Sequence, residues 1–66
     1  MGKLSFEIFC IENYADQTNL KSFEVYELFK KEGLLELLRS DYEDLHGMGM
    51  EYMVNFCRDY LGDNKV

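Results

Sequence analysis

Apolar residues recur along this chain at spacings of three and four positions, the period of an α-helix with one buried face. The first such stripe comprises Leu4, Ile8, Ile11 and Ala15, and it is widened by Phe6, Phe9 and Cys10. Glu7 falls outside the stripe. A strand over residues 6–11 is the alternative, because β-branched and aromatic residues are dense there. Since the helical spacing persists for three turns, we predict a helix over residues 4–15.

A polar break at residues 16–21 precedes the second predicted helix. Leu20, the one apolar residue in this break, is expected to enter the core. Ser22 is the expected N-cap, since its hydroxyl can accept a hydrogen bond from a free backbone N–H. Gly33 suits the left-handed conformation that ends a helix. The buried face between these two residues comprises Val25, Leu28 and Phe29. Together these signals predict a helix over residues 23–32.

Leucines dominate the third segment, which begins at Leu34. Its apolar face continues through Tyr42 and Leu45, and this pattern predicts a helix over residues 34–46. An interruption at residues 40–41, followed by a short second segment, is the alternative.

The glycine-rich residues 47–49 are the clearest break in the chain, and a regular stripe follows them. This stripe comprises Met50, Met53, Val54, Cys57, Tyr60 and Leu61. It predicts a helix over residues 50–61, with Gly62 as its stop and residues 63–66 as a tail. The whole pattern predicts an all-α protein, a compact bundle of four short helices in a single domain over residues 1–66.

Composition and charge narrow the range of functions. The chain has 66 residues, of which 47% are hydrophobic and none is proline, so it should fold as one small domain. Its net charge of −6 disfavours nucleic acid and anionic membrane surfaces, which are bound through Lys and Arg. A basic protein partner is easier, because complementary charge speeds encounter. No apolar run approaches the length of a membrane span, and we expect a cytoplasmic protein.

The sequence contains no recognisable catalytic, cofactor-binding or metal-binding constellation. His46 is the only histidine, whereas zinc sites usually need three or four ligands. Cys10 and Cys57 each lie in an apolar run, so we expect two buried thiols, with one disulfide between the first and last helices as the alternative. A nucleophile–base pair would require one of these thiols to meet His46 in space. We therefore expect neither an enzyme nor a bound cofactor or metal.

The second and third segments resemble a helix-turn-helix in outline. A recognition helix must present polar or basic side chains to base edges. The third segment instead opens with Leu34-Leu35-Glu36-Leu37-Leu38, one acid and four leucines. These residues match LxxLL, a motif that docks into grooves of other proteins, but we expect the leucines to lie in the core. The segment is therefore unsuited to reading DNA.

More apolar side chains are present than four short helices can bury. Exposed aromatic side chains on a small domain often mark a protein interface, and the acidic residues concentrate between Asp41 and Glu51. The candidate partner-binding residues are Phe23, Tyr26, Tyr42, Glu43, Asp44, His46 and Phe56. We expect a non-enzymatic protein–protein interaction module. A homo-oligomeric structural protein and a small domain that senses a ligand or metal are the alternatives.

Several short motifs, spread over nearly the whole chain, occur here together. They are Phe9-Cys10-Ile11-Glu12 with Tyr14, Glu24-Val25 with Leu28-Phe29 and Gly33, Tyr42 with Leu45-His46, and Tyr60-Leu61. This set resembles a family of bacterial proteins of about this size that is known only as a domain of unknown function. Residues 47–49 depart from the commoner pattern of that family.

Members of that family are often encoded beside a second protein that resembles ADP-ribosyltransferase toxins. The resemblance therefore implies an accessory or antitoxin-like partner rather than an enzyme, and it supplies no catalytic residues. The expected partner is another protein, basic and encoded nearby, with a homodimer as the alternative.

Overall fold

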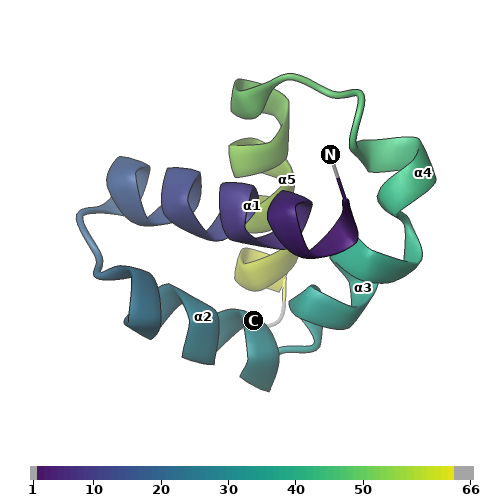
Figure 1. The fold of residues 1–66 in the computed structure, drawn as a ribbon. Coiled ribbons are helices and arrows are strands. Elements are labelled where there is room, and N and C mark those ends of the chain that lie inside the picture. The colour runs from purple at the N-terminus through teal and green to yellow at the C-terminus, as the bar shows by residue number, and fades with distance from the viewer. Residues whose placement is uncertain (1, 64–66) are drawn as a thin grey trace.

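The computed structural model describes residues 2–63, and over this range the chain forms five α-helices and no strand (Figure 1). They are α1 (Lys3–Thr18), α2 (Ser22–Lys31), α3 (Leu34–Ser40), α4 (Tyr42–Leu45) and α5 (Met50–Asp63). The predicted all-α class is thereby confirmed. α1 is the central element, because it packs against α2, α3 and α5. Figure 1 shows α5 crossing steeply behind α1, with α3 and α4 at one end of α1.

The buried face of α1 overlaps the predicted stripe but is not identical with it. Its buried residues are Phe6, Glu7, Cys10, Ile11, Tyr14 and Ala15. Leu4 is 67% exposed and Ile8 is 49% exposed, so the predicted stripe is wrong at these two positions. Glu7, which falls outside that stripe, is only 4% exposed. The cause is tertiary: α1 contacts three helices, and the side of α1 that faces α3 carries Glu7, where Arg39 pairs with its carboxylate.

The first helix extends one turn beyond its predicted end. It stops at Thr18 because Asn19 adopts the left-handed conformation, with φ of 60°, which asparagine tolerates better than most residues. The backbone N–H of Leu20 then donates to the carbonyl oxygen of Ala15 at 3.1 Å. This cap leaves Leu20 at the surface, so its predicted burial in the core is wrong.

The start of α2 is capped differently from the prediction. Lys21, not Ser22, occupies the N-cap position. The Glu24 carboxylate accepts a hydrogen bond from the Lys21 backbone N–H at 3.0 Å, so the acid in the first turn satisfies a free donor. The Ser22 hydroxyl instead donates to the Glu12 carboxylate at 2.7 Å and ties α2 to α1.

A tight turn at Gly33 joins α2 to α3, and α5 contacts this turn. Gly33 has φ of 79°, which confirms the predicted left-handed conformation. The hydroxyl of Tyr60 on α5 donates to the carbonyl oxygen of Glu32 at 2.8 Å. A carbonyl oxygen exposed by the end of α2 is thereby satisfied, and α5 is held against the turn.

The predicted single helix over residues 34–46 is wrong, and the alternative interruption is confirmed. Asp41 has φ of −100° and ψ of 20°, which separates α3 from the short α4. The change of direction lets Tyr42 pack edge-on against Phe6 of α1, with ring centroids 5.4 Å apart, and buries Leu45. α4 is thus positioned by its contact with α1.

α5 completes the core, with two departures from the predicted helix. Met50 is exposed at the first turn, and Gly62 lies inside the helix rather than after it. Residues 64–66 of the predicted tail lie outside the described residues. Within residues 2–63 no helix is long and apolar enough to cross a membrane. The buried apolar residues outside α1 are Val25, Phe29, Leu34, Leu38, Leu45, Met53, Val54, Cys57 and Leu61.

Candidate interaction surface

The exposed flank of α1 carries two large aliphatic side chains. Leu4 and Ile8 are four residues apart, so they lie one above the other on the helix surface. Both are exposed, although their neighbours Phe6 and Cys10 are buried. Since the helix turns by about 100° per residue, one side of α1 serves the core while this side faces solvent.

α2 presents a matching flank beside α1. Phe23 is 66% exposed and Tyr26 is 42% exposed, while Val25 and Phe29 on the same helix are fully buried. Phe23 and Tyr26 are three residues apart and are therefore neighbours on the helix surface. The ammonium nitrogen of Lys30 lies 6.0 Å from the centre of the Tyr26 ring, within cation–π range.

A groove of about 410 Å³ separates α2 from α3. Its lining residues are Tyr26, Lys30, Leu35, Glu36 and Arg39. The partly buried Leu35 packs against the core. The groove is open and shallow, so it is suited to a side chain of another macromolecule rather than to a fully enclosed small ligand.

An ion pair with the buried Glu7 carboxylate holds Arg39 in place at this groove. The Arg39 guanidinium donates from Nε to one oxygen of the Glu7 carboxylate at 2.9 Å and from Nη2 to the other at 3.3 Å. The Glu7 side chain is 5% exposed, whereas that of Arg39 is 62% exposed. The hydrogen bond that the guanidinium donates to the Glu7 carboxylate raises the pKa of Arg39 further above its already high ordinary value. Arg39 therefore keeps its charge and orientation while its outer edge faces solvent.

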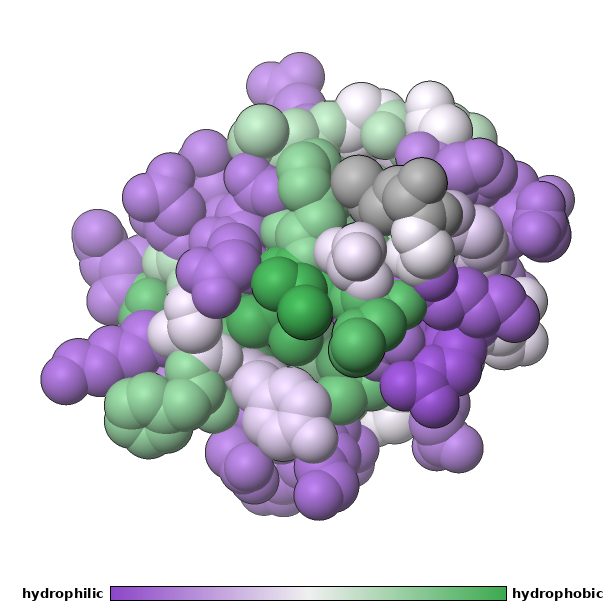
Figure 2. Space-filling model, viewed as in Figure 1, coloured by the Kyte–Doolittle hydropathy of each residue, from purple (hydrophilic) through white to green (hydrophobic). Residues whose placement is uncertain are grey.

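These flanks form one surface, which we call the apolar face. It comprises Leu4, Ile8, Phe23, Tyr26 and Leu35. The Glu7–Arg39 pair connects its parts, since Glu7 is next to Ile8 on α1 and Arg39 is one turn after Leu35 on α3. Figure 2 shows apolar side chains gathered in the centre of the side that α1 crosses, with hydrophilic residues around them.

The remaining predicted partner-binding residues lie around α4 and α5. Glu43 and Asp44 are exposed in the first turn of α4, where the helix dipole favours acids. Nδ1 of His46 lies 2.9 Å from the carbonyl oxygen of Tyr42, and since a carbonyl can only accept, this contact requires the proton on Nδ1. The His46 ring also stacks on the Tyr42 ring, with centroids 4.6 Å apart. We call the exposed residues within the range 43–51, a set that excludes the buried Leu45, the acidic end.

The structure thus divides the seven predicted residues into separate groups. Phe23 and Tyr26 lie together on α2, whereas Tyr42 and Phe56 are half-buried and pack against the core. Sequence reasoning missed the apolar face residues of α1, because Leu4 and Ile8 keep the spacing of a buried stripe. Only the aromatic side chains of α2 signalled this surface in advance.

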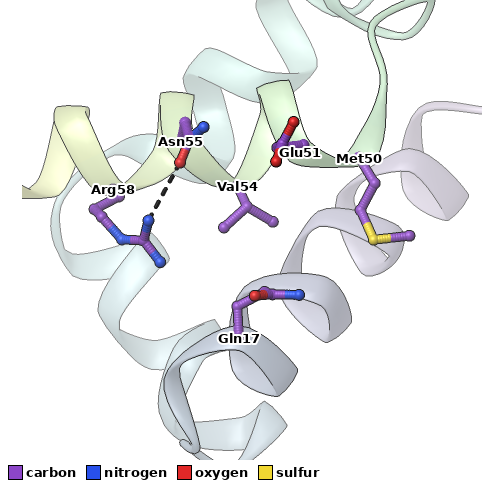
Figure 3. A pocket seen from close by; sticks show the side chains of 6 residues that line it. All are labelled: Gln17, Met50, Glu51, Val54, Asn55 and Arg58. Atoms are coloured by element: carbon purple, nitrogen blue, oxygen red, sulfur yellow. Dashed lines mark hydrogen bonds between the residues drawn. The ribbon is translucent and has the colours of Figure 1, made fainter.

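A second hollow, of about 250 Å³, lies between the end of α1 and α5 (Figure 3). Val54 points into it from α5, and Gln17 reaches toward it from α1. The Arg58 guanidinium at its edge donates to the amide oxygen of Asn55 at 3.2 Å. Every polar group at this hollow belongs to an exposed or half-buried surface residue, so the hollow is a shallow surface feature without a buried polar anchor.

The two cysteines are buried, as predicted, and both are free thiols. Burial raises the pKa of each thiol to about 12, with a smaller contribution from the Glu7 carboxylate at Cys10. At neutral pH both groups therefore stay protonated, and neither is an accessible nucleophile. Among residues 2–63 no three His, Cys, Asp or Glu side chains are arranged to hold a metal ion.

The leucine motif of α3 packs into the core. Leu34 and Leu38 are completely buried, as predicted, so LxxLL is not displayed to a partner. The exposed polar side chains of α3 include Glu36 and Arg39, and Arg39 is paired with Glu7. This helix has no row of free basic or amide groups with which to read bases.

Comparison with known protein families identifies relatives of this chain. The model of the family described as "Protein of unknown function (DUF3791)" matches residues 5–64. The chain belongs to the DUF3791 family. No curated protein and no solved structure matches it. In this DUF3791 chain the matched range includes the whole of α2, α3, α4 and α5, and therefore every residue of the apolar face except Leu4.

Proposed function

We propose that this chain is a non-enzymatic protein-interaction module and that its partner binds the apolar face. The observation that carries the proposal is the exposure of Leu4 and Ile8 on α1 and of Phe23 and Tyr26 on α2, two helices that pack side by side. Exposed apolar surface costs about 25 cal/mol per Å² relative to its burial. A contiguous patch with a polar rim is typical of surfaces that another protein covers.

The groove beside the patch supports the same proposal. Hot spots of protein interfaces favour aromatic residues and arginine, and Tyr26 and Arg39 line this groove. Arg39 is held by Glu7 before any partner arrives, so less side-chain entropy is lost when a partner binds.

The acidic end would have a second role in partner choice. Between Arg39 and Arg58 the chain has no Lys or Arg, whereas Glu43, Asp44 and Glu51 are exposed. Such a region attracts a basic protein at long range and raises its rate of association. We propose a partner with a basic patch beside an apolar contact site.

The family resemblance suggests who this partner is. Similar bacterial proteins are often encoded beside a protein that resembles ADP-ribosyltransferase toxins. We therefore propose a cytoplasmic accessory or antitoxin-like role, in which this chain binds the neighbouring gene product.

Co-expression of the chain with the neighbouring reading frame, followed by affinity capture, tests the proposal. Phe23→Ala and Ile8→Ala should each weaken capture about tenfold or more, because each removes a large contact. Tyr52→Ala is the matched control, since Tyr52 is equally exposed but lies on α5 outside the apolar face. Capture that survives Phe23→Ala and Ile8→Ala but is lost on Glu43→Lys would place the contact at the acidic end instead.

A further inference from the structure

We propose that, in the absence of its partner, a second copy of this chain covers the apolar face through a two-fold symmetric contact in which Lys30 of each copy pairs with Glu36 of the other. The inference rests on the proposed function in one respect, since both use the apolar face. It adds a specific occupant and a means by which the face is protected until the partner binds.

The charge of the groove favours a second copy as the occupant. Two chains of net charge −6 repel each other over most of their surfaces. The groove is an exception, because Lys30 and Arg39 line it against one acid, Glu36. Arg39 is already paired with the Glu7 carboxylate, so Lys30 and Glu36 are left along the groove as one positive and one negative charge. Acidic residues farther away are screened at physiological salt, where the Debye length is about 8 Å.

The placement of these charges favours two-fold symmetry. Lys30 stands on the α2 wall of the groove and Glu36 on the α3 wall. A two-fold axis through the groove would place α2 of one copy over α3 of the other. The same pair of opposite charges then meets twice, which is the property of a self-complementary surface.

The apolar residues supply the contact between these charge pairs. Tyr26 lines the groove from α2 and Leu35 lines it from α3. Phe23 on α2 and Leu4 and Ile8 on α1 are exposed on helices that pack against each other beside it. Under the two-fold axis the exposed apolar side chains of the two copies pack against one another. Aromatic residues desolvated at the centre of a contact, with charges at its rim, are the arrangement expected of an interface.

Sedimentation velocity of the full chain at micromolar to millimolar concentrations, at physiological salt, tests the proposal. A dimer is expected. Lys30→Glu and Glu36→Lys should each weaken the dimer about tenfold or more, because each creates two like-charge contacts. An equimolar mixture of these two variants should form a heterodimer, since every pair then has opposite charges again.

Lys31→Glu is the matched control for the charge change. Lys31 is exposed on the same helix but lies about 100° further round, away from the groove. Its dimer should match that of the unmodified chain, and circular dichroism should show all three variants folded. Three results would each overturn the proposal: a monomer at every concentration, a dimer whose affinity is unchanged by Lys30→Glu and Glu36→Lys, or a mixture of these two variants that stays monomeric.

The result is separable from the test of partner binding. A chain that is monomeric but loses its partner on Phe23→Ala would retain the interaction module and reject only the self-pairing. A dimer that follows the charge rules, in a chain that captures no neighbouring gene product, would retain the self-pairing and reject the proposed function.

Discussion

The apolar face and the acidic end are two different surfaces of one small domain. The apolar face lies on α1, α2 and α3, has large exposed hydrophobic side chains and borders a groove that both basic and acidic residues line. The acidic end lies at α4 and the start of α5, where exposed acids have no Lys or Arg among them. In Figure 1, α2 and α4 stand on opposite sides of the molecule.

Because the two surfaces are separate, the apolar residues and the acidic residues would contribute to partner binding in different ways. An apolar patch contributes to affinity, because burying it releases water and fills contacts. Exposed charge contributes mainly to the rate of encounter and to specificity. A substitution in the apolar face should therefore change the affinity but not the rate of encounter, and a substitution at the acidic end should do the reverse.

The largest expected effect is on the free energy of unfolding, when a substitution on the buried face of α2 is compared with one on its exposed face. Phe29→Ala should destabilise the fold by about 3–5 kcal/mol, because Phe29 is completely buried and packs edge-on against Tyr14. Such a loss is comparable with the whole stability of a domain this small, roughly 3–10 kcal/mol. Phe23→Ala should change the free energy of unfolding by only about 0.5 kcal/mol. Urea unfolding followed by circular dichroism measures both, and equal losses would mean that Phe23 belongs to the core.

A second effect concerns the core that lies beneath both surfaces. Burial raises the pKa of the Cys57 thiol, and likewise that of Cys10, from 9.0 to about 12. Above pH 9 the unfolded chain loses these protons while the folded chain keeps them. The stability they contribute is therefore complete below pH 9 and falls toward pH 12, by up to about 1.4 kcal/mol per pH unit for each thiol.

Urea unfolding at a series of pH values checks this alkaline loss. Cys57→Ala is the appropriate comparison: the variant is less stable at neutral pH, because the buried thiol is removed, but its stability should fall less steeply above pH 9. Parallel curves for the two proteins would contradict the assignment and attribute the loss to other titrating groups.

A third effect concerns the turn that sets α3 between the two regions. Gly33→Ala should cost roughly 1–2 kcal/mol, because φ of 79° strains any residue with a Cβ. Collision is not the reason, since the new Cβ would lie 3.5 Å from the Tyr60 hydroxyl, an ordinary contact. Gly47→Ala is the control, because its Cβ would meet nothing within 4 Å. Thermal unfolding should separate the two variants by several degrees.

The smallest effect on stability is expected at the acidic end. Glu43→Lys should change the free energy of unfolding by no more than about 0.5 kcal/mol, since Glu43 is exposed and contributes mainly through the α4 dipole. It should nevertheless slow association with a basic partner and weaken the dependence of that rate on salt. Stopped-flow measurements of the association rate check this, with Asp59→Lys as the control, because it makes the same change of charge on α5, outside the acidic end. Identical slowing by both variants would mean that only net charge matters.

Much of the fold was predictable because helical periodicity is local. The buried positions Val25, Phe29, Leu34 and Leu38 follow from spacing alone, as does the left-handed turn at Gly33. The stripe of α5 likewise identified most of the residues that α5 buries. Each of these features depends on neighbours within one or two turns.

The candidate surface was less predictable, since exposure depends on what packs nearby. Phe23 was named because it falls outside the main stripes, and Tyr26 because the aromatic side chains cannot all point inward. Leu4 and Ile8 keep the spacing of buried residues, and no local signal distinguishes them from Ile11.

The sequence by itself determined that the chain is all-α, where most of its helices lie, and that its thiols are buried and its surface acidic. Only the tertiary structure decided that Glu7 and Tyr14, rather than Leu4 and Ile8, complete the buried face of α1. Glu7 is buried because Arg39, 32 residues away, is brought beside it, and Ile8 is exposed because no helix packs over that side. Periodicity defines the faces of a helix, but the position of its neighbours decides which face is covered.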